Sequence, residues 1–138
     1  MARVVLSVPF RAVLARRETR SHQLADAAFE YKLDGARIQA HKADDEVRLF
    51  SRTLRDVTDA APEVVELVRA LPARRLILDG EVIALRPDGR PHPFQVTMRR
   101  FGRKLDVEQT RAELPLTPFF FDCLMIDGDI LLDEPQER

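Results

Sequence analysis

Alternation of apolar and polar residues is the strongest constraint on the fold of this chain. Every second residue is apolar from 38 to 40 and from 47 to 49, on either side of the connecting segment 43–46, which is acidic from 44 to 46. A period of two places successive side chains on opposite faces of an extended strand. The pattern therefore predicts two half-buried strands in antiparallel pairing, joined by a short turn. The apolar positions are Ile38, Ala40, Val47 and Leu49.

A helical period follows. Pro62 suits the first turn of a helix, and apolar residues then recur at i, i+3, i+4 and i+7 before Pro72 ends the run. These apolar residues are expected to face the core. They are Val64, Leu67, Val68 and Leu71.

The segment 75–85 allows two interpretations. Two apolar runs, 76–78 and 82–85, enclose Asp79, Gly80 and Glu81. Asp-Gly can mark a hairpin turn with Glu81 in solvent, or the segment can form one bent strand whose acids need partners. We favour the single strand, because Pro87-Asp88-Gly89 just downstream is the better hairpin turn.

The remaining segments predict short elements. A helix is expected over 93–101 with Phe94, Met98 and Phe101 in the core and Gly102 at its end, and 106–113 suits a short exposed helix or loop. An apolar strand is expected over 119–126, followed by a turn at 127–128. Residues 1–20 suggest an extended lead-in and a basic loop, 21–28 a brief helix, and 29–34 a strand that Gly35 ends.

Composition limits the class of protein. With 138 residues, 45% hydrophobic and 33% charged, the chain fits one soluble globular domain, and its net charge of −1 provides no general field for a polyanion. Cys123 is the only cysteine, which excludes an internal disulfide. No apolar stretch approaches the ~20 residues of a membrane span. We therefore expect no membrane association and a cytoplasmic location.

Lysine is scarce, which narrows the choice of nucleophile. Only three of the 22 basic residues are lysines. A lysine amine that burial or nearby cations keep neutral can bond to phosphorus, whereas arginine stays charged and suits forked phosphate contacts. Lys32 lies between Phe29, Tyr31 and Leu33 with Arg37 nearby, so it is the candidate; a strand-end lysine with its amine in solvent is the alternative.

Two further side chains are open to more than one interpretation. Arg52 follows a predicted strand and is either directed into the same cleft as Lys32 or a surface arginine beside Asp56. Phe121, the last of three consecutive phenylalanines, is either a core residue or a ring for stacking on a planar base.

Four segments together resemble ATP-dependent DNA ligases. They are Glu-Tyr-Lys-Leu-Asp-Gly-Ala-Arg at 30–37, Leu-Phe-Ser-Arg-Thr-Leu-Arg-Asp-Val-Thr at 49–58, Leu-Asp-Gly-Glu-Val-Ile-Ala-Leu at 78–85, and Phe-Phe-Asp-Cys-Leu-Met-Ile-Asp-Gly at 120–128. The resemblance implies an α+β fold of mainly antiparallel β-sheets with flanking helices, of the nucleotidyltransferase type that DNA ligases share with mRNA capping enzymes (ATP-grasp-like).

The resemblance also implies a reaction and its residues. A lysine takes AMP from ATP, AMP passes to the 5′-phosphate of nicked duplex DNA, and the 3′-hydroxyl displaces it during DNA repair, replication or recombination. Lys32 matches the adenylated lysine. The other matched positions imply that Glu30 contacts adenine, Arg37 and Arg52 contact ribose and phosphates, Glu81 contacts a ribose hydroxyl or Mg²⁺, Phe121 stacks on the base, and Asp34 with Gly35 supports the loop.

Two later motifs of these ligases, a Glu-Gly pair and a Lys-x-Lys pair, are not found before Arg138. We therefore expect residues 1–138 to be the N-terminal part of an incomplete adenylation domain. Alone it should not seal nicks, should be adenylated poorly if at all, and should be prone to self-association. The alternatives are an RNA ligase, a capping-type nucleotidyltransferase, or a nucleotide-binding module without catalysis.

Overall fold

The computed structural model describes residues 32–102 and 106–134. The chain divides into two units, Met1–Lys32 and Leu33–Arg138, whose positions relative to each other are not determined. The segments predicted for 1–28, and most of the strand predicted for 29–34, lie outside the described residues. Residues 32–34 are not in a strand, so that prediction is wrong for its described part.

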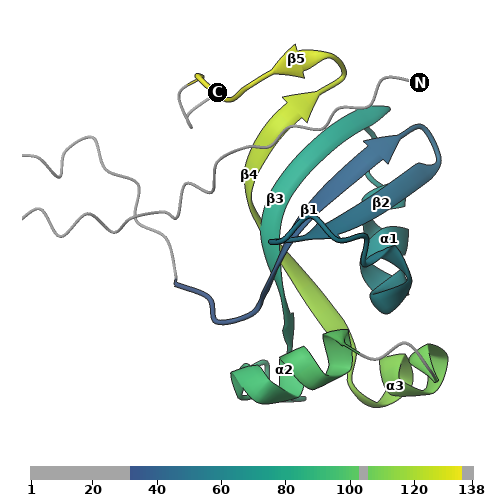
Figure 1. Cartoon of the computed structure of the whole chain (residues 1–138), viewed down its shortest axis with the longest axis vertical. Coiled ribbons are helices and arrows are strands. Elements are labelled where there is room, and N and C mark those ends of the chain that lie inside the picture. Colours follow the sequence, from purple (N-terminus) through teal and green to yellow (C-terminus); the bar gives the residue numbers. More distant parts are fainter. Residues whose placement is uncertain (1–31, 103–105, 135–138) are drawn as a thin grey trace, which may run out of the picture. The chain divides into compact units, whose positions relative to one another are not determined.

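The second unit is built on an antiparallel sheet with strand order β2-β1-β3-β4-β5 (Figure 1). Within the described residues, three short α-helices and a 3₁₀ turn connect the strands. The elements are β1 (Ala36–Ala43), β2 (Glu46–Ser51), η2 (Thr58–Ala60), α1 (Pro62–Arg69), β3 (Arg75–Ala84), α2 (Phe94–Phe101), α3 (Val107–Glu113), β4 (Leu116–Ile126) and β5 (Asp129–Ile130). The α+β fold and the β1–β2 hairpin expected from the alternating pattern are confirmed.

The single-strand interpretation of 75–85 is also confirmed. Strand β3 runs unbroken from Arg75 to Ala84 between β1 and β4, and the hairpin turn lies downstream where Gly89 has a φ of 80°. Asp79 and Glu81 therefore sit inside the sheet rather than in a solvent-exposed turn. A central strand of this kind places both acids opposite residues of two neighbouring strands.

The core lies between the sheet and α1. Val64, Val65 and Val68 of α1 pack against alternate residues of the first three strands, such as Ile38 and Leu49, which are fully buried. Leu67 was expected in this core but is 45% exposed. Val65 takes its place, so the helix has turned slightly from the orientation that a simple i, i+3 stripe suggests.

The buried face of α2 differs more strongly from the one predicted from the sequence. Phe101 is buried as expected, but Phe94 is 47% and Met98 38% exposed, while Thr97 and Arg100 are buried instead. The Oγ1 of Thr97 accepts a hydrogen bond from the Ala84 amide at 3.1 Å, which ties α2 to the end of β3. Polar anchoring has therefore overridden apolar periodicity in this helix. In Figure 1, α2 and α3 lie at one end of the sheet and β5 at the other.

None of the described helices is both long enough and apolar enough to cross a membrane.

Candidate functional site

A charged cluster lies on the sheet face opposite α1. Core residues such as Ile38 and Leu78 point toward α1, so Arg37 of β1 and Asp79 of β3 project from the other face. The Nε and Nη2 of Arg37 donate to the two carboxylate oxygens of Asp79 at 2.7 and 2.6 Å. Both side chains are largely buried, with 13% and 15% exposed. This forked pair fixes the guanidinium plane firmly.

Phe121 lies against the same guanidinium. The Cζ of Arg37 is 4.4 Å from the centre of the Phe121 ring, within cation–π range. Pairing shifts by one residue here, because Asp79 is opposite Asp122 whereas Gly80 is opposite Phe120. Phe121 is thus the extra residue of a β-bulge, which can redirect a side chain. A base that stacks on Phe121 must use the ring face that Arg37 does not cover, or must displace Arg37.

Gly35 and Glu81 form the second half of the cluster. The Gly35 amide donates to Glu81 Oε2 at 2.9 Å. A Cβ at Gly35 would lie 2.7 Å from the Ile83 Cγ1 and closer still to the Val82 carbonyl oxygen. Glycine is therefore required by the close approach of two chain segments, whereas the sequence had suggested a tight turn.

Gly80 is needed for a similar reason. Its Cβ would lie 2.5 Å from the Phe119 carbonyl oxygen and 2.8 Å from Phe120 Cδ1. The two glycines let β3 approach its neighbours closely at the point where Asp79 and Glu81 project.

His41 extends the same face toward β2. Its ring meets Phe50 edge-on with centroids 5.0 Å apart, and its Nε2 is 3.0 Å from the Gln39 side-chain oxygen. Burial lowers the pKa of His41 below its usual 6.5. The imidazole is therefore neutral at physiological pH.

The structure brings together several of the residues named from the sequence. Arg37, Glu81, Gly35 and Phe121 share one region, and Asp34 is exposed directly before Gly35. Asp79, which the sequence analysis did not include in the site, completes it. An acid within an apolar strand was the available signal, because such an acid needs a partner.

The outcome differs for the other three predicted residues, which are Arg52, Glu30 and Lys32. Ser51 pairs with Ile38, so Arg52 follows in an exposed turn at the end of the sheet where Arg37 lies. Glu30 is outside the described residues. Lys32 belongs to the preceding unit, so its position beside the cluster stays a prediction.

Lys42 has a structural role. It is buried, and its amine donates to the carbonyl of Arg69 at 2.8 Å and to that of Leu71. A cation suits the carbonyl end of a helix, so Lys42 stabilises the end of α1. It is therefore an implausible nucleophile, which restricts the choice of lysine to Lys32 and Lys104.

No group of three His, Cys, Asp or Glu side chains in the described part of the chain is arranged to hold a metal ion. A groove of about 430 Å³ lies elsewhere, where α1 and α3 meet β2, and no residue of the cluster lines it. Any Mg²⁺ at the cluster would therefore depend on one or two carboxylates together with ligand phosphates, which is the arrangement this ion favours.

Residues 9–138 match a family described as the ATP dependent DNA ligase domain. This chain belongs to that family. A probable DNA ligase of Sorangium cellulosum is 65% identical over 113 residues, covering 82% of this chain and 21% of the relative. DNA ligase B of Mycobacterium tuberculosis is 52% identical over 132 residues, covering 92% and 26% respectively. This ligase-family chain thus spans about a fifth to a quarter of the length of these curated relatives.

Solved structures agree with the family. The ligase domain of M. tuberculosis LigD has a TM-score of 0.61 at 31% identity, covering 76% of this chain and 31% of that one. A mycobacterial DNA ligase D complexed with ATP and MES also has a TM-score of 0.61, at 32% identity and the same coverage. The fold is therefore that of a ligase nucleotidyltransferase domain, as the sequence resemblance implied.

Proposed function

We propose that this ligase-family chain supplies the part of an adenylation site that binds ATP and accepts AMP on Lys32. The observation that carries the proposal is the cluster of Arg37, Asp79, Glu81 and Phe121 on one sheet face. It combines a fixed cation, a carboxylate and an aromatic ring, which suit phosphate, ribose and base. One structural relative was solved with ATP bound, which adds support.

The proposed chemistry is transfer of a nucleotidyl group. The neutral amine of Lys32 attacks the α-phosphorus of ATP, a nitrogen–phosphorus bond forms, and the bond to the bridging oxygen breaks. Pyrophosphate leaves and the amine proton passes to solvent. Only Leu33 and Asp34 separate Lys32 from Gly35, whose amide holds Glu81. The protein's contribution is positioning and charge stabilisation, as in other phosphoryl transfers.

The remaining side chains have the following roles in this proposal. Arg37 and Arg52 contact ribose and phosphates, and Glu30 contacts adenine. Phe121 stacks on the base with the ring face turned away from Arg37. Glu81 contacts the ribose or helps to hold Mg²⁺, which would supply charge neutralisation at the phosphates.

ATP binding and covalent labelling test these roles separately. We expect calorimetry to detect ATP binding that weakens at least about tenfold, or ~1.4 kcal/mol, in Glu81→Ala and in Arg37→Ala. Radiolabelled ATP should leave label only on Lys32. Label that persists in Lys32→Ala, or ATP affinity unchanged in both cluster variants, would contradict the proposal. Binding without any adduct would favour a nucleotide-binding module.

We further propose nicked duplex DNA as the macromolecular partner, in cytoplasmic DNA repair, replication or recombination. The outer face of α2 supports a DNA contact. Phe94 and Met98 lie one helical turn apart and are both exposed, beside the exposed Arg99. Apolar side chains next to a guanidinium suit sugar and phosphate groups.

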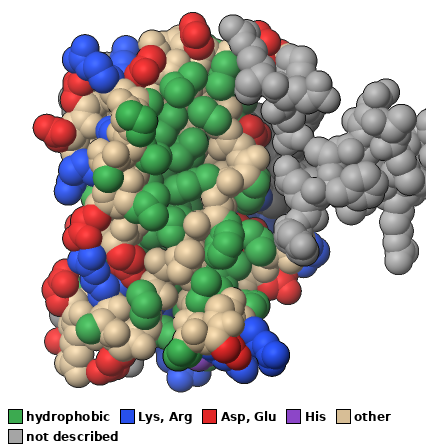
Figure 2. Space-filling view, turned by 180° about the vertical axis from the view of Figure 1, so that it is seen from behind, with side chains coloured by type: hydrophobic (Ala, Val, Ile, Leu, Met, Phe, Trp, Pro, Cys, Tyr) green, Lys and Arg blue, Asp and Glu red, His purple; other side chains and the backbone are tan. Residues whose placement is uncertain are grey.

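Self-association is the last part of the proposal. Strand β4 has eleven residues, yet β5 pairs only with Met125 and Ile126 on its outer side, so most of that edge carries no strand among the described residues. Figure 2 shows apolar side chains gathered in a band on the face seen there. Unpaired edges and apolar bands both favour association with a second copy.

A further inference from the structure

Helix α2 could pack against the sheet in two orientations. Its buried face contains Thr97, Arg100 and Phe101, whereas its apolar stripe contains Phe94, Met98 and Phe101. At about 100° per residue, the centres of these two faces lie roughly 70° apart around the helix axis. Phe101 belongs to both faces and does not discriminate between them. A turn of α2 by that angle would bury the two exposed apolar side chains, which the hydrophobic effect favours.

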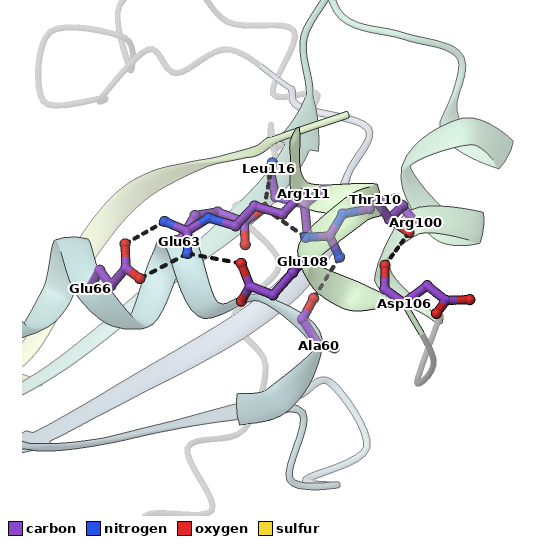
Figure 3. Close-up of polar contacts among 9 residues, drawn as sticks. All are labelled: Ala60, Glu63, Glu66, Arg100, Asp106, Glu108, Thr110, Arg111 and Leu116. Atoms are coloured by element: carbon purple, nitrogen blue, oxygen red, sulfur yellow. Dashed lines mark hydrogen bonds and ion pairs between the residues drawn. The ribbon is translucent and has the colours of Figure 1, made fainter. Parts of the chain in front are cut away.

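Arg100 holds the observed orientation by joining α2 to α1 and to the turn before it (Figure 3). Its Nη2 donates to Glu63 Oε1 at 2.8 Å, and its Nη1 donates to the Ala60 carbonyl oxygen at 2.7 Å. The Arg100 side chain has no exposed surface. The same Glu63 oxygen accepts a hydrogen bond from the Leu116 amide at 2.8 Å, which fixes the carboxylate. A turned helix would carry the guanidinium away from both of its acceptors.

Thr97 holds the same orientation at a second point. Its Oγ1 accepts a hydrogen bond from the Ala84 amide at 3.1 Å, and Ala84 is fully buried. The threonine side chain is short, so a turn of α2 would withdraw the hydroxyl from this amide. A buried amide without a partner is unfavourable.

The polar contacts of α2 are a poor choice if stability is their only role. Glu63 Oε2 and Arg100 Nε are buried and have no hydrogen-bond partner in the part of the chain that the structure describes. Apolar residues of similar size often replace a buried ion pair without loss of stability. Helix α2 has large apolar residues in Phe94 and Met98 but keeps both exposed. A departure from local pattern without a gain in burial is typical of functional sites.

We infer that Thr97 and Arg100 are positioning residues, which hold α2 in the orientation that presents Phe94 and Met98 to nicked duplex DNA. The use of this surface by DNA rests on the proposed function. The orientation of the helix does not.

Oxidation of methionine measures the orientation directly. Hydrogen peroxide converts an accessible methionine to its sulfoxide, so the rate reports whether Met98 faces solvent. Met98 is 38% exposed and Met125 is 9% exposed. Peptide mapping of the wild type should therefore show faster oxidation of Met98, and Met125 is the internal reference for a folded core.

The anchor variant carries Thr97→Ala, Arg100→Ala and Glu63→Gln. The glutamine still offers an oxygen to the Leu116 amide and leaves no buried charge unpaired. Without the two anchors, burial of the apolar stripe should turn α2. We expect oxidation of Met98 to slow by about fivefold or more in this variant, because oxidation follows exposure, while the rate at Met125 stays low.

Three further variants serve as comparisons. Glu66→Gln with Arg111→Ala removes an ion pair between α1 and α3 that does not involve α2, and Met98 should then oxidise as in the wild type. Thr97→Ala alone should slow oxidation in the same direction as the anchor variant. Thr97→Ser keeps an acceptor for the Ala84 amide and should match the wild type.

DNA binding tests the functional part separately. Fluorescence anisotropy with a nicked duplex should show about tenfold weaker binding by the anchor variant, and a similar loss in Phe94→Ala with Met98→Ala, because both remove the same apolar contacts. If the wild type binds no nicked duplex, the proposed partner is wrong, and the oxidation rates still decide the orientation. Unchanged affinity in an anchor variant with protected Met98 would overturn the link to DNA.

Two oxidation results would overturn the inference as a whole. One is an anchor variant in which Met98 oxidises at the wild-type rate while Met125 stays protected. The other is rapid oxidation of both methionines in the anchor variant together with an unchanged rate in Thr97→Ala, because the polar contacts would then stabilise the whole unit without orienting α2.

Discussion

The absence of a side chain at Gly35 allows two chain segments to approach closely at the candidate site. A Cβ there would collide with the Val82 carbonyl, which is backbone of a central strand and cannot move aside. We expect Gly35→Ala to destabilise the chain by about 1–3 kcal/mol in urea unfolding, because overpacking forces backbone shifts. Gly102→Ala is the control, since its Cβ would meet, among the residues that the structure describes, only the Met98 carbonyl oxygen at 3.2 Å, and should have a small effect.

His41 predicts a dependence of stability on pH. Burial lowers its pKa in the folded chain below 6.5, so the unfolded chain binds the proton more readily. Stability is therefore full above pH 6.5 and falls as the pH drops through that value toward the folded pKa. As the pH falls through this window, the melting temperature of the wild type should decrease more than that of His41→Gln. Equal pH dependence in the two chains would contradict this assignment.

Helix α2 offers a test of the DNA contact. If Arg99 meets a phosphate, Arg99→Ala should reduce the salt dependence of nicked-duplex binding by about one unit in the log–log slope. Fluorescence anisotropy across a salt series measures this slope. Arg74→Ala is a suitable comparison, because Arg74 is 82% exposed but precedes the opposite end of β3. An equal reduction of the slope in both variants would contradict the assignment of α2 as the DNA contact surface.

The same helix marks the limit of prediction from sequence. The β1–β2 hairpin was predictable because alternation of apolar and polar residues leaves few alternatives. The segment 75–85 allowed two interpretations, and the better turn downstream favoured the continuous strand that the structure shows. Helix α2 was located correctly, but its buried face was not. Apolar periodicity favoured Phe94 and Met98, whereas hydrogen bonds made by Thr97 and Arg100 decide which side faces inward. Those partners are distant in sequence and only the fold brings them together.

The site was predictable to a similar extent. Arg37, Glu81 and Phe121 were named from motifs, and the structure places them together. The pairing of Arg37 with Asp79 and the bulge at Phe121 depend on strand register, which no local pattern specifies. The positions of Glu30 and Lys32 beside them remain predictions.

For the chain as a whole, we expect concentration-dependent association. Light scattering should show a mass that rises with concentration, and Thr117→Lys on the β4 edge should reduce it, because an edge lysine disfavours strand addition. Thr53→Lys, in the exposed turn after β2, adds the same charge away from that edge. A monomer at every concentration tested, or equal effects of both substitutions, would exclude pairing through β4.

The position of Lys42 has a practical outcome for chemical labelling. With its ammonium enclosed against the carbonyls of Arg69 and Leu71, it should resist acylating reagents in the native chain. Only two lysine side chains then compete for any such reagent, Lys32 and Lys104. Peptide mapping after brief acylation, with and without ATP, would therefore show which of these two lysine side chains ATP protects.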